Sequence, residues 1–191
     1  MDAPGISVRP LVNMADEQPV KYLVGEENRG WYIGMTTLDF ERSNISTAAQ
    51  YRRTFEQLVD YVKNGTNGSS RTNGDEAGTS VNAKLADLAI ENQVGRYLSY
   101  RVASMQSRGQ IPNYESSAAK VYHSEYGQRL AGAGLQIVGM HGTLREESKH
   151  ARMRGRFART YLTSIGGTIA AGTSEIQRGI IAQRGLGLSR I

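Results

Sequence analysis

Two segments in the C-terminal third of the sequence have residue types suited to binding a phosphate-bearing ligand. In Gln136–Met140, glycine would let backbone N–H groups approach phosphate oxygens closely. At Thr173–Glu175, a predicted helix start would present exposed amides and the positive end of its dipole. Each segment also has a structural interpretation, the first as a glycine-rich helix C-cap and the second as an N-terminal capping box. The residues alone leave both interpretations open.

Other common catalytic and metal-binding patterns are absent from the sequence. There is no cysteine, which excludes disulfides, thiolate metal sites and cysteine nucleophiles. His123, His141 and His150 are not spaced with acidic neighbours as metal ligands, and we interpret them as structural or exposed. No P-loop, Ser-His-Asp order or GxGxxG after a strand occurs. We therefore expect no metal site.

The elements that would position these segments are mostly helices, as apolar residues at three- and four-residue steps indicate. The stripe from Trp31 to Val62 predicts one helix of roughly nine turns, about 50 Å long. Glycine, asparagine and serine after it predict a flexible connection, followed by a second helix over about 80–108. Leu85, Leu88, Val94, Leu98, Val102 and Met105 are expected near one face of that second helix.

Three further helices follow. Asn113 is a favourable helix start, with Glu115 in the first turn, and this third helix should continue to about Val138. A fourth, arginine-rich helix is expected over roughly 150–164. A last short helix should begin with a capping box at Ser174 and end at Gly185.

The chain is therefore expected to be an all-α, up-down helical bundle over 25–191 with a short β segment before it. Ile6 and Val8 alternate with polar residues and predict a strand over 4–12, and the polar residues that follow are typical of a linker. We accordingly divide the chain into 1–24 and 25–191.

Net charge and apolar runs limit the partners. The 23 basic and 18 acidic residues give +5, which favours nucleic acid, anionic lipid or a small anionic ligand. Interleaved aromatic residues for base stacking are not apparent, so we expect no nucleic-acid partner. Neither a signal peptide nor an apolar run long enough to span a membrane is present, and with no cysteine this fits a cytoplasmic protein.

Four segments, in order and spacing, resemble the signatures of the acyl-CoA dehydrogenase family. They are Gly25–Trp31, Leu38–Arg42, Gln136–Gly142 and the long C-terminal segment from Gly166 to Gly187, which is the most specific. The resemblance covers about residues 4–191, and residues 1–24 then resemble the end of the family's middle β-domain. It is closest to actinobacterial-type members and implies α,β-dehydrogenation of an acyl-CoA thioester with FAD as cofactor.

The resemblance implies a position for the general base of that reaction. Some members carry it immediately before the Gly-Thr of the last motif, where this chain has Ala171. Others, such as the isovaleryl type, carry it on the long helix, where this chain has Glu41. Glu41 is thus the implied catalytic base. The alternative is a surface carboxylate paired with Arg42 or Arg52.

Further residues match family positions for ligand contacts. Asp39 and Arg42 match positions that contact the acyl-CoA. After the long helix, the family's Arg-x-x-Phe-Gly, whose arginine contacts FAD, is replaced by Lys63–Gly68. The positions that match FAD contacts, the first five toward a neighbouring subunit, are Gln136, Ile137, Val138, Gly139, Met140, Thr173, Ser174 and Glu175.

The family also has a large N-terminal helical domain and most of a β-domain upstream of the matching region. The resemblance implies an acyl-CoA substrate, electron-transfer flavoprotein as redox partner, and a homo- or hetero-oligomer. Because those domains hold much of the flavin and the acyl tunnel, we expect little dehydrogenase turnover from this chain alone. The alternative function is that of a non-catalytic remnant or assembly subunit that pairs with another acyl-CoA dehydrogenase.

Overall fold

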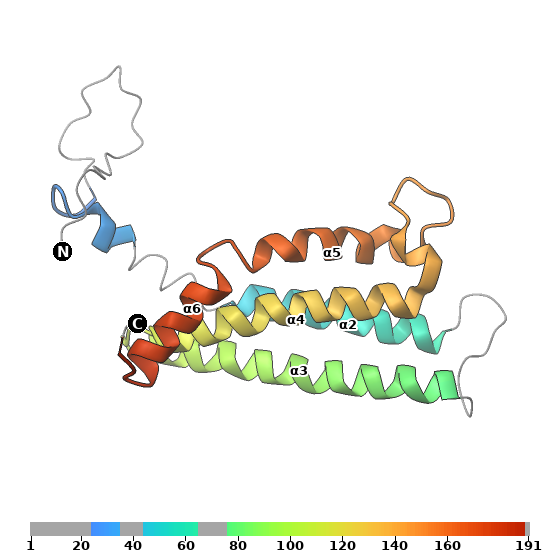
Figure 1. Cartoon of the computed structure of the whole chain (residues 1–191), viewed down its shortest axis with the longest axis horizontal. Helices are drawn as coiled ribbons and strands as arrows, with labels where there is room; N and C mark the ends of the chain where they lie inside the picture. The colour runs from blue at the N-terminus through green and yellow to red at the C-terminus, as the bar shows by residue number, and fades with distance from the viewer. Residues whose placement is uncertain (1–23, 35–43, 65–75, 190–191) are drawn as a thin grey trace, which may run out of the picture.

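The computed structural model describes residues 24–34, 44–64 and 76–189, and every regular element within these ranges is helical (Figure 1). The strand predicted over 4–12 lies outside the described residues. The elements are α2 (Ile45–Lys63), α3 (Glu76–Ser107), α4 (Tyr114–Val138), η2 (Gly139–Thr143), η3 (Arg152–Gly155), α5 (Arg156–Gly167), α6 (Ser174–Ile180) and the π-helical turn η4 (Ile181–Gly185).

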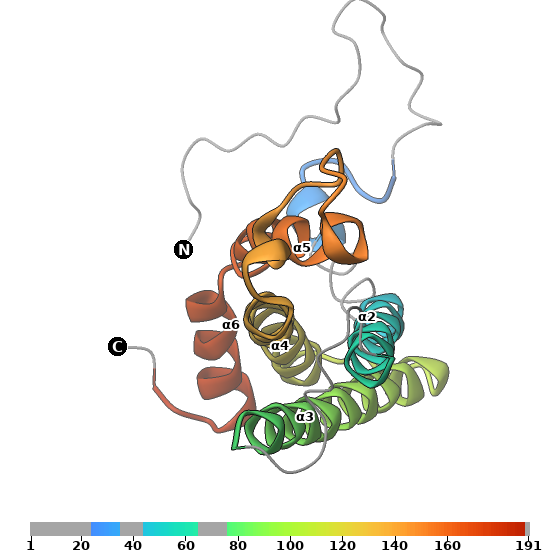
Figure 2. The same cartoon turned by 90° about the vertical axis from the view of Figure 1, so that its right-hand side faces the viewer.

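The helices run alternately up and down, as the sequence predicted. Helices α2, α3 and α4 pack against one another along their lengths, and α5 lies along α4 (Figures 1 and 2). Helix α6 crosses the N-terminal half of α4. Helix α4 is therefore central to the bundle and contacts each of the other long helices.

The core lies between α4 and its neighbours. Tyr126 and Leu130 of α4 are almost completely buried, together with Leu58 of α2, Leu88 of α3 and Phe157 of α5. Complete burial of one such aliphatic or aromatic side chain contributes about 1.5–3 kcal/mol. One shared core thus joins α2 to α5.

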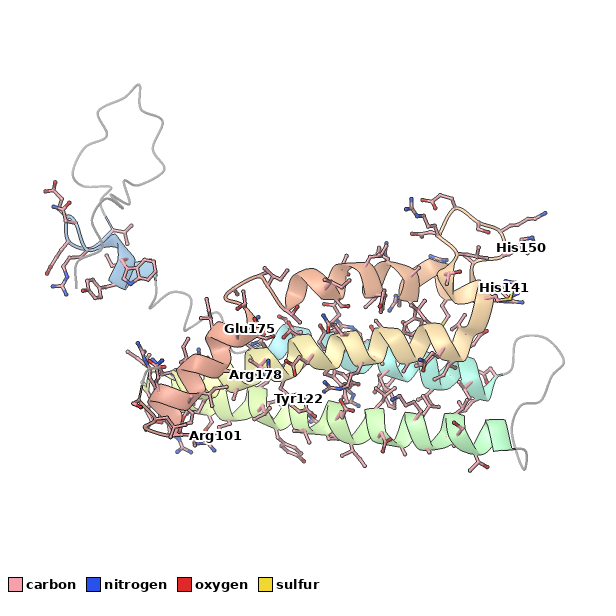
Figure 3. All side chains as sticks on the ribbon, viewed as in Figure 1. Arg101, Tyr122, His141, His150, Glu175 and Arg178 are labelled. Carbon is pink, nitrogen blue, oxygen red and sulfur yellow. The ribbon has the colours of Figure 1, made fainter. Side chains whose placement is uncertain are left out.

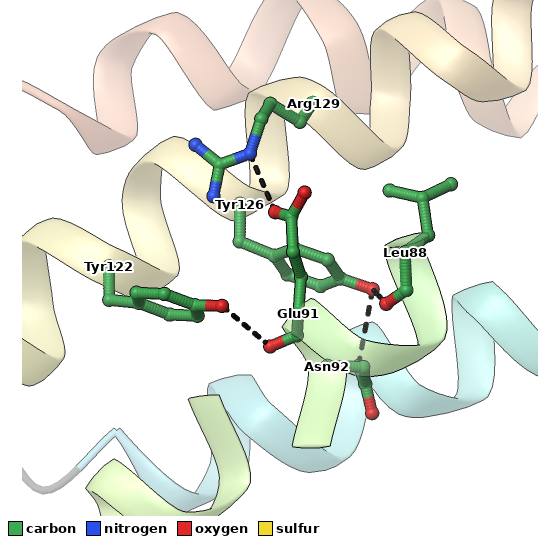
Figure 4. Close-up of polar contacts among 6 residues, drawn as sticks. All are labelled: Leu88, Glu91, Asn92, Tyr122, Tyr126 and Arg129. Atoms are coloured by element: carbon green, nitrogen blue, oxygen red, sulfur yellow. Dashed lines mark hydrogen bonds and ion pairs between the residues drawn. The ribbon is translucent and has the colours of Figure 1, made fainter. Parts of the chain in front are cut away.

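A polar cluster fixes α3 against α4 inside this apolar packing (Figure 4). The Tyr126 hydroxyl donates to the carbonyl of Leu88 at 3.2 Å and accepts from the Asn92 amide at 3.4 Å. Beside it, Arg129 Nε lies 2.6 Å from the carboxylate of Glu91. Burial raises the pKa of the Tyr126 phenol, so this hydroxyl stays protonated and acts as a donor.

The single nine-turn helix predicted over the first apolar stripe is wrong. Helix α2 begins at Ile45, because Asn44 has left-handed backbone angles (φ 55°, ψ 20°) that a continuous helix does not allow. Asparagine tolerates this conformation better than most residues. Trp31, which the stripe assigned to the apolar face, is 65% exposed.

Other boundaries were predicted more closely. Helix α4 follows Asn113 and ends at Val138 as expected, although the Asn113 side chain makes no capping bond. Helix α5 begins at Arg156 rather than near residue 150, because Met153 and Arg154 are left-handed. On α3, Leu85, Leu88 and Val102 are buried as predicted, whereas Val94 is 41% exposed.

Candidate functional site

The turn that leads into α6 is held by two side chains from other parts of the bundle. Lys120 of α4 is buried and donates from Nζ to the carbonyl of Gly172 at 2.6 Å. Gln177 of α6 is fully buried and donates from Nε2 to the carbonyl of Ala171 at 2.9 Å. Both turn residues are left-handed, with φ 56° at Ala171 and 92° at Gly172. A Cβ at residue 172 would lie 2.5 Å from Gln177 Nε2, so a side chain there would collide with Gln177.

The start of α6 differs in detail from the predicted capping box. Thr173, not Ser174, is the N-cap, and its hydroxyl accepts from the backbone N–H of Ile176 at 3.3 Å. Ser174 is buried, and its hydroxyl oxygen has no hydrogen-bond partner among the described residues. The pKa of the exposed Glu175 carboxyl is lowered by a hydrogen bond from its own backbone N–H and by one from Thr173. The anionic end of Glu175 thus helps to satisfy the helix N-terminus.

Thr173, Ser174 and Glu175 line an open pocket of about 480 Å³ between α4, the end of α5 and α6. The two arginines that line this pocket each form an ion pair with a carboxylate of the same chain. Arg178 contacts Glu125 at 2.5 Å, and Arg129 is paired with Glu91. The described residues therefore offer this pocket mainly backbone and hydroxyl groups rather than unpaired cations.

The second predicted segment, Gln136–Met140, lies at the opposite end of α4. Gln136 and Ile137 line a separate pocket of about 370 Å³ with residues from the start of α3. Val138 is buried in the core, whereas Met140 is 89% exposed. Gly139 is left-handed (φ 73°), and its N–H donates to the carbonyl of Leu135, so this segment is a helix C-cap as well as an exposed loop.

The two segments do not form one site within a single chain. Lys120, which contacts the first, and Gln136, in the second, are sixteen residues apart on one helix, or about 24 Å at 1.5 Å per residue. Figure 3 shows Glu175 and Arg178 near one end of α4 and His141 and His150 beyond the other end. The two segments therefore lie at opposite ends of the bundle.

The predicted base and substrate residues cannot be placed from the described ranges. Glu41, Asp39 and Arg42 all lie outside them, just before Asn44. The alternative pair of Glu41 with Arg52 also lies outside the described residues. Within them, Arg52 Nε donates to Glu56 at 2.7 Å.

Lys120 and Gln177 are the site residues that sequence reasoning missed. Lys120 is one lysine within a run of small and apolar residues, Ser116–Val121, that is buried almost throughout. A lysine in such a run is rarely buried without a specific partner, and this signal could have identified it. Gln177 carries no comparable signal, because a glutamine in a short helix is usually exposed.

The histidines fit their structural interpretation. His123 is buried, with Nδ1 2.7 Å from the carbonyl of Ala119 and Nε2 3.4 Å from the Ser99 hydroxyl. His141 and His150 are exposed. Within the described residues no group of three potential ligand side chains could hold a metal ion, and no helix is long and apolar enough to cross a membrane.

Comparisons with known proteins agree with this geometry. Residues 28–186 match the family described as acyl-CoA dehydrogenase, C-terminal domain. Acyl-CoA dehydrogenase FadE26 of Mycobacterium tuberculosis is 30% identical over 176 residues, which cover 90% of this chain and 43% of FadE26. Acyl-CoA dehydrogenase IpdE1 of Mycolicibacterium smegmatis is 26% identical, and the match covers 100% of this chain and 48% of IpdE1.

Solved structures give the same result. The ChsE4-ChsE5 complex from M. tuberculosis superposes with a TM-score of 0.77 at 29% identity, covering 91% of this chain and 45% of the matched chain. The Tcur3481-Tcur3483 steroid ACAD gives a TM-score of 0.78 at 25% identity, covering 91% and 44%. The chain thus spans a little less than half the length of these relatives. It belongs to the acyl-CoA dehydrogenase family, and residues 28–186 form the family's C-terminal helical domain.

Proposed function

We propose that this chain is the C-terminal helical half of an FAD-dependent acyl-CoA dehydrogenase and that it works in an oligomer with a chain that supplies the rest of the active site. The observation that carries the proposal is the turn at Ala171 and Gly172, whose left-handed backbone Lys120 and Gln177 hold directly before Thr173–Glu175, the residues that match flavin contacts in the family. A buried lysine and a buried glutamine each donate a hydrogen bond to one of two adjacent carbonyls. Such contacts favour a functional role for the conformation of this turn.

The residues present fit a share of an FAD site. Thr173, Ser174 and Glu175 offer a capped helix start beside an open pocket, and the buried hydroxyl of Ser174 has no partner among the described residues. At the other end of α4, the exposed loop through Gly139 and Met140 would reach the FAD of a neighbouring subunit. Lys63 and Asn64, at the end of α2, do not reproduce the arginine that contacts FAD in the family. FAD would therefore be held jointly by two chains.

FAD, when bound, accepts the hydride that leaves the β-carbon of the acyl-CoA, and electron-transfer flavoprotein would take the electrons onward. Within this chain, Glu41 removes the α-proton, while Asp39 and Arg42 contact the thioester substrate. Ala171 has no proton-accepting group, which leaves Glu41, the other base position that the family resemblance implies. A carboxylate in that role needs a water-poor cleft, so that its pKa rises toward the pH of the reaction.

The test uses the oligomer that contains this chain, isolated by co-expression with an acyl-CoA dehydrogenase chain that co-purifies with it. Glu41→Gln should lower acyl-CoA-dependent reduction of an artificial electron acceptor by about 100-fold or more, because general-base catalysis contributes on that order. The flavin absorbance per oligomer should not change. Asp60→Asn, at an exposed carboxylate of α2 without an ion pair among the described residues, is the matched control. Full activity in Glu41→Gln would remove this residue from the role of base.

The second candidate function is that of a non-catalytic assembly subunit. It is favoured by Ala171, which puts no proton-accepting group at one of the two base positions that the family resemblance implies. Two of the matching structures, ChsE4-ChsE5 and Tcur3481-Tcur3483, contain two named chains. An oligomer that keeps full activity with Glu41→Gln but loses flavin without this chain would establish that role. A flavin-loaded, active homo-oligomer would exclude it.

A further inference from the structure

Positive charge is concentrated in residues 145–159, which form the corner between η2 and α5 and are called the basic corner below. This segment contains five arginines and Lys149 against Glu146 and Glu147, or 6 − 2 = +4. The whole chain carries +5. Four-fifths of the excess charge therefore lies in one short part of the surface.

The cations of the basic corner are barely neutralised within the chain. One ion pair lies inside it, between Arg159 and Glu146 at 3.6 Å, and both side chains are more than half exposed. No described carboxylate pairs with the remaining arginines, which are Arg145, Arg152, Arg154 and Arg156. Elsewhere in the described bundle, five arginines form an ion pair with a carboxylate: Arg29, Arg52, Arg101, Arg129 and Arg178.

Three consecutive residues of the basic corner have left-handed backbone dihedral angles. Met153, Arg154 and Gly155 are left-handed in succession, with φ of 51°, 54° and 61°. Left-handed backbone costs about 1–2 kcal/mol at each residue with a side chain. Gly155 packs so closely that a Cβ would lie 2.7 Å from the backbone nitrogen of Glu146 and 2.8 Å from the carbonyl oxygen of Leu144. The arginines thus project from a fixed, strained turn, of the kind that occurs at functional sites.

Apolar side chains are exposed directly beside the basic corner. On the outer side of α5, Leu162 is 64% exposed and Ile165 49% exposed, and Ile169 just beyond the helix is 61% exposed. These residues follow three- and four-residue steps and so lie on one face. A pocket of about 340 Å³ joins the two features, with Arg145, Arg154 and Leu162 in its lining. An apolar centre with a charged rim is the usual composition of a protein–protein interface.

We propose that the outer face of α5 together with the basic corner is a docking surface for a second protein chain that presents acidic residues around an apolar centre. The proposal rests on the proposed function in one respect, since that partner is the chain that supplies the missing half of the active site. Charge complementarity would guide the approach and fix the orientation, and the apolar stripe would set the lifetime of the complex.

The described part of a second copy of this chain does not offer the required surface. Six described carboxylates are already in ion pairs with arginines. The other acidic side chains that the structure describes are spread over several elements and form no patch: Glu27, Asp60, Asp87, Glu147 and Glu175. Nucleic acid is also disfavoured, because Phe157, which is the one Phe, Tyr or Trp in the basic corner, is only 2% exposed and cannot stack on a base.

The test measures the affinity of this chain for the acyl-CoA dehydrogenase chain that co-purifies with it, over a series of salt concentrations. The triple variant Arg145→Glu, Arg154→Glu, Arg156→Glu should weaken binding by at least roughly tenfold at low salt, mainly through slower association, and flatten the salt dependence. Folding should survive, since a glutamate at residue 156 lies in the first turn of α5, where the dipole favours an anion. The matched control reverses three exposed cations elsewhere, Arg53, Lys63 and Arg108, and should change the affinity less than about twofold.

The apolar stripe is tested by a separate variant, Leu162→Ser with Ile165→Ser. This variant should speed dissociation while the salt dependence stays that of the wild type. Circular dichroism of each variant shows whether it is folded, and hydrogen exchange of the wild-type complex should show protection over 145–169 but not over 45–63.

Four results would overturn the inference. Unchanged affinity and salt dependence in the triple variant, with the complex still formed, would reject the docking surface and leave the proposed function intact. Self-association of the purified chain that the triple variant abolishes would make a second copy the occupant. A duplex-DNA gel shift that the same variant abolishes would assign the charge to nucleic acid. A chain that binds no dehydrogenase chain at all would reject the proposed function and this inference together.

Discussion

Gly155 is the position where the backbone of the bundle leaves least room for substitution. Gly155→Ala would force a Cβ into left-handed backbone and to within 3 Å of the backbone at residues 144–146. We expect a loss of roughly 2–4 kcal/mol in the free energy of unfolding, from the left-handed penalty and the overpacking together. Urea denaturation followed by circular dichroism measures this.

Gly166, near the other end of the same helix, is the control for that substitution. A Cβ at Gly166 would meet nothing within 4 Å, and its backbone is helical. Gly166→Ala should therefore stabilise the chain by about 0.5–1 kcal/mol. Equal effects of the two substitutions would show that the turn at Gly155 is not constrained as described.

Protonation of His123 should couple stability to pH. Burial lowers the pKa of its imidazole, partly opposed by the hydrogen bond to Ala119. The unfolded chain, with a histidine pKa near about 6.5, then binds a proton that the folded chain does not, so stability falls as the pH drops below that value. We expect the wild-type urea midpoint to decrease between about pH 6.5 and pH 5, and His123→Gln to reduce that decrease. His150→Gln, at an exposed histidine, should leave it unchanged.

Much of the arrangement of helices could be predicted from apolar spacing, but not the points where the backbone departs from it. The limits of α4 followed from Asn113 and the glycines after Val138, because local chemistry decides them. The break at Asn44 could not be predicted, because the apolar stripe continues on both sides and only one dihedral angle interrupts it.

The candidate site was predictable in part for the same reason. Cap chemistry and the resemblance pointed to Thr173–Glu175 as candidate site residues. The hydrogen bond from Lys120 to the carbonyl of Gly172, by contrast, joins residues fifty-two positions apart. Such a contact depends on how α6 lies across α4, and neither helix carries it in its own sequence. Glu41, the predicted base, stays a prediction.

The contact between α3 and α4 depends on one buried hydroxyl more than on ion pairs. Tyr126→Phe keeps the ring in the core but leaves the Leu88 carbonyl without that donor and the Asn92 amide without that acceptor. We expect a loss of about 1–3 kcal/mol in the free energy of unfolding, as for other buried polar groups left unsatisfied. Arg129→Gln, which removes the partly exposed pair with Glu91, should cost less than about 1 kcal/mol. Thermal unfolding of the two variants would contradict this ranking if Arg129→Gln were the less stable.

At the scale of the whole molecule, the bundle has one continuous core but holds the two segments predicted to contact flavin far apart. The core joins α2 to α5 through α4, which is the basis for cooperative unfolding. The two segments lie at opposite ends of α4, and the chain spans less than half of the length of its relatives.

We therefore expect the purified chain to be a folded protein with little flavin and little or no acyl-CoA dehydrogenase activity. Added FAD should raise its melting temperature only slightly, because a ligand stabilises a fold according to its affinity, and the contacts from a second chain are missing. Mixing with the co-purifying dehydrogenase chain should produce a yellow complex whose absorbance is bleached by an acyl-CoA. The comparison is made on one preparation, by absorbance and by turnover, before and after mixing. Strong flavin binding and turnover by the isolated chain would show that the segments at the two ends of α4 are completed by copies of this chain, and that no other chain is needed.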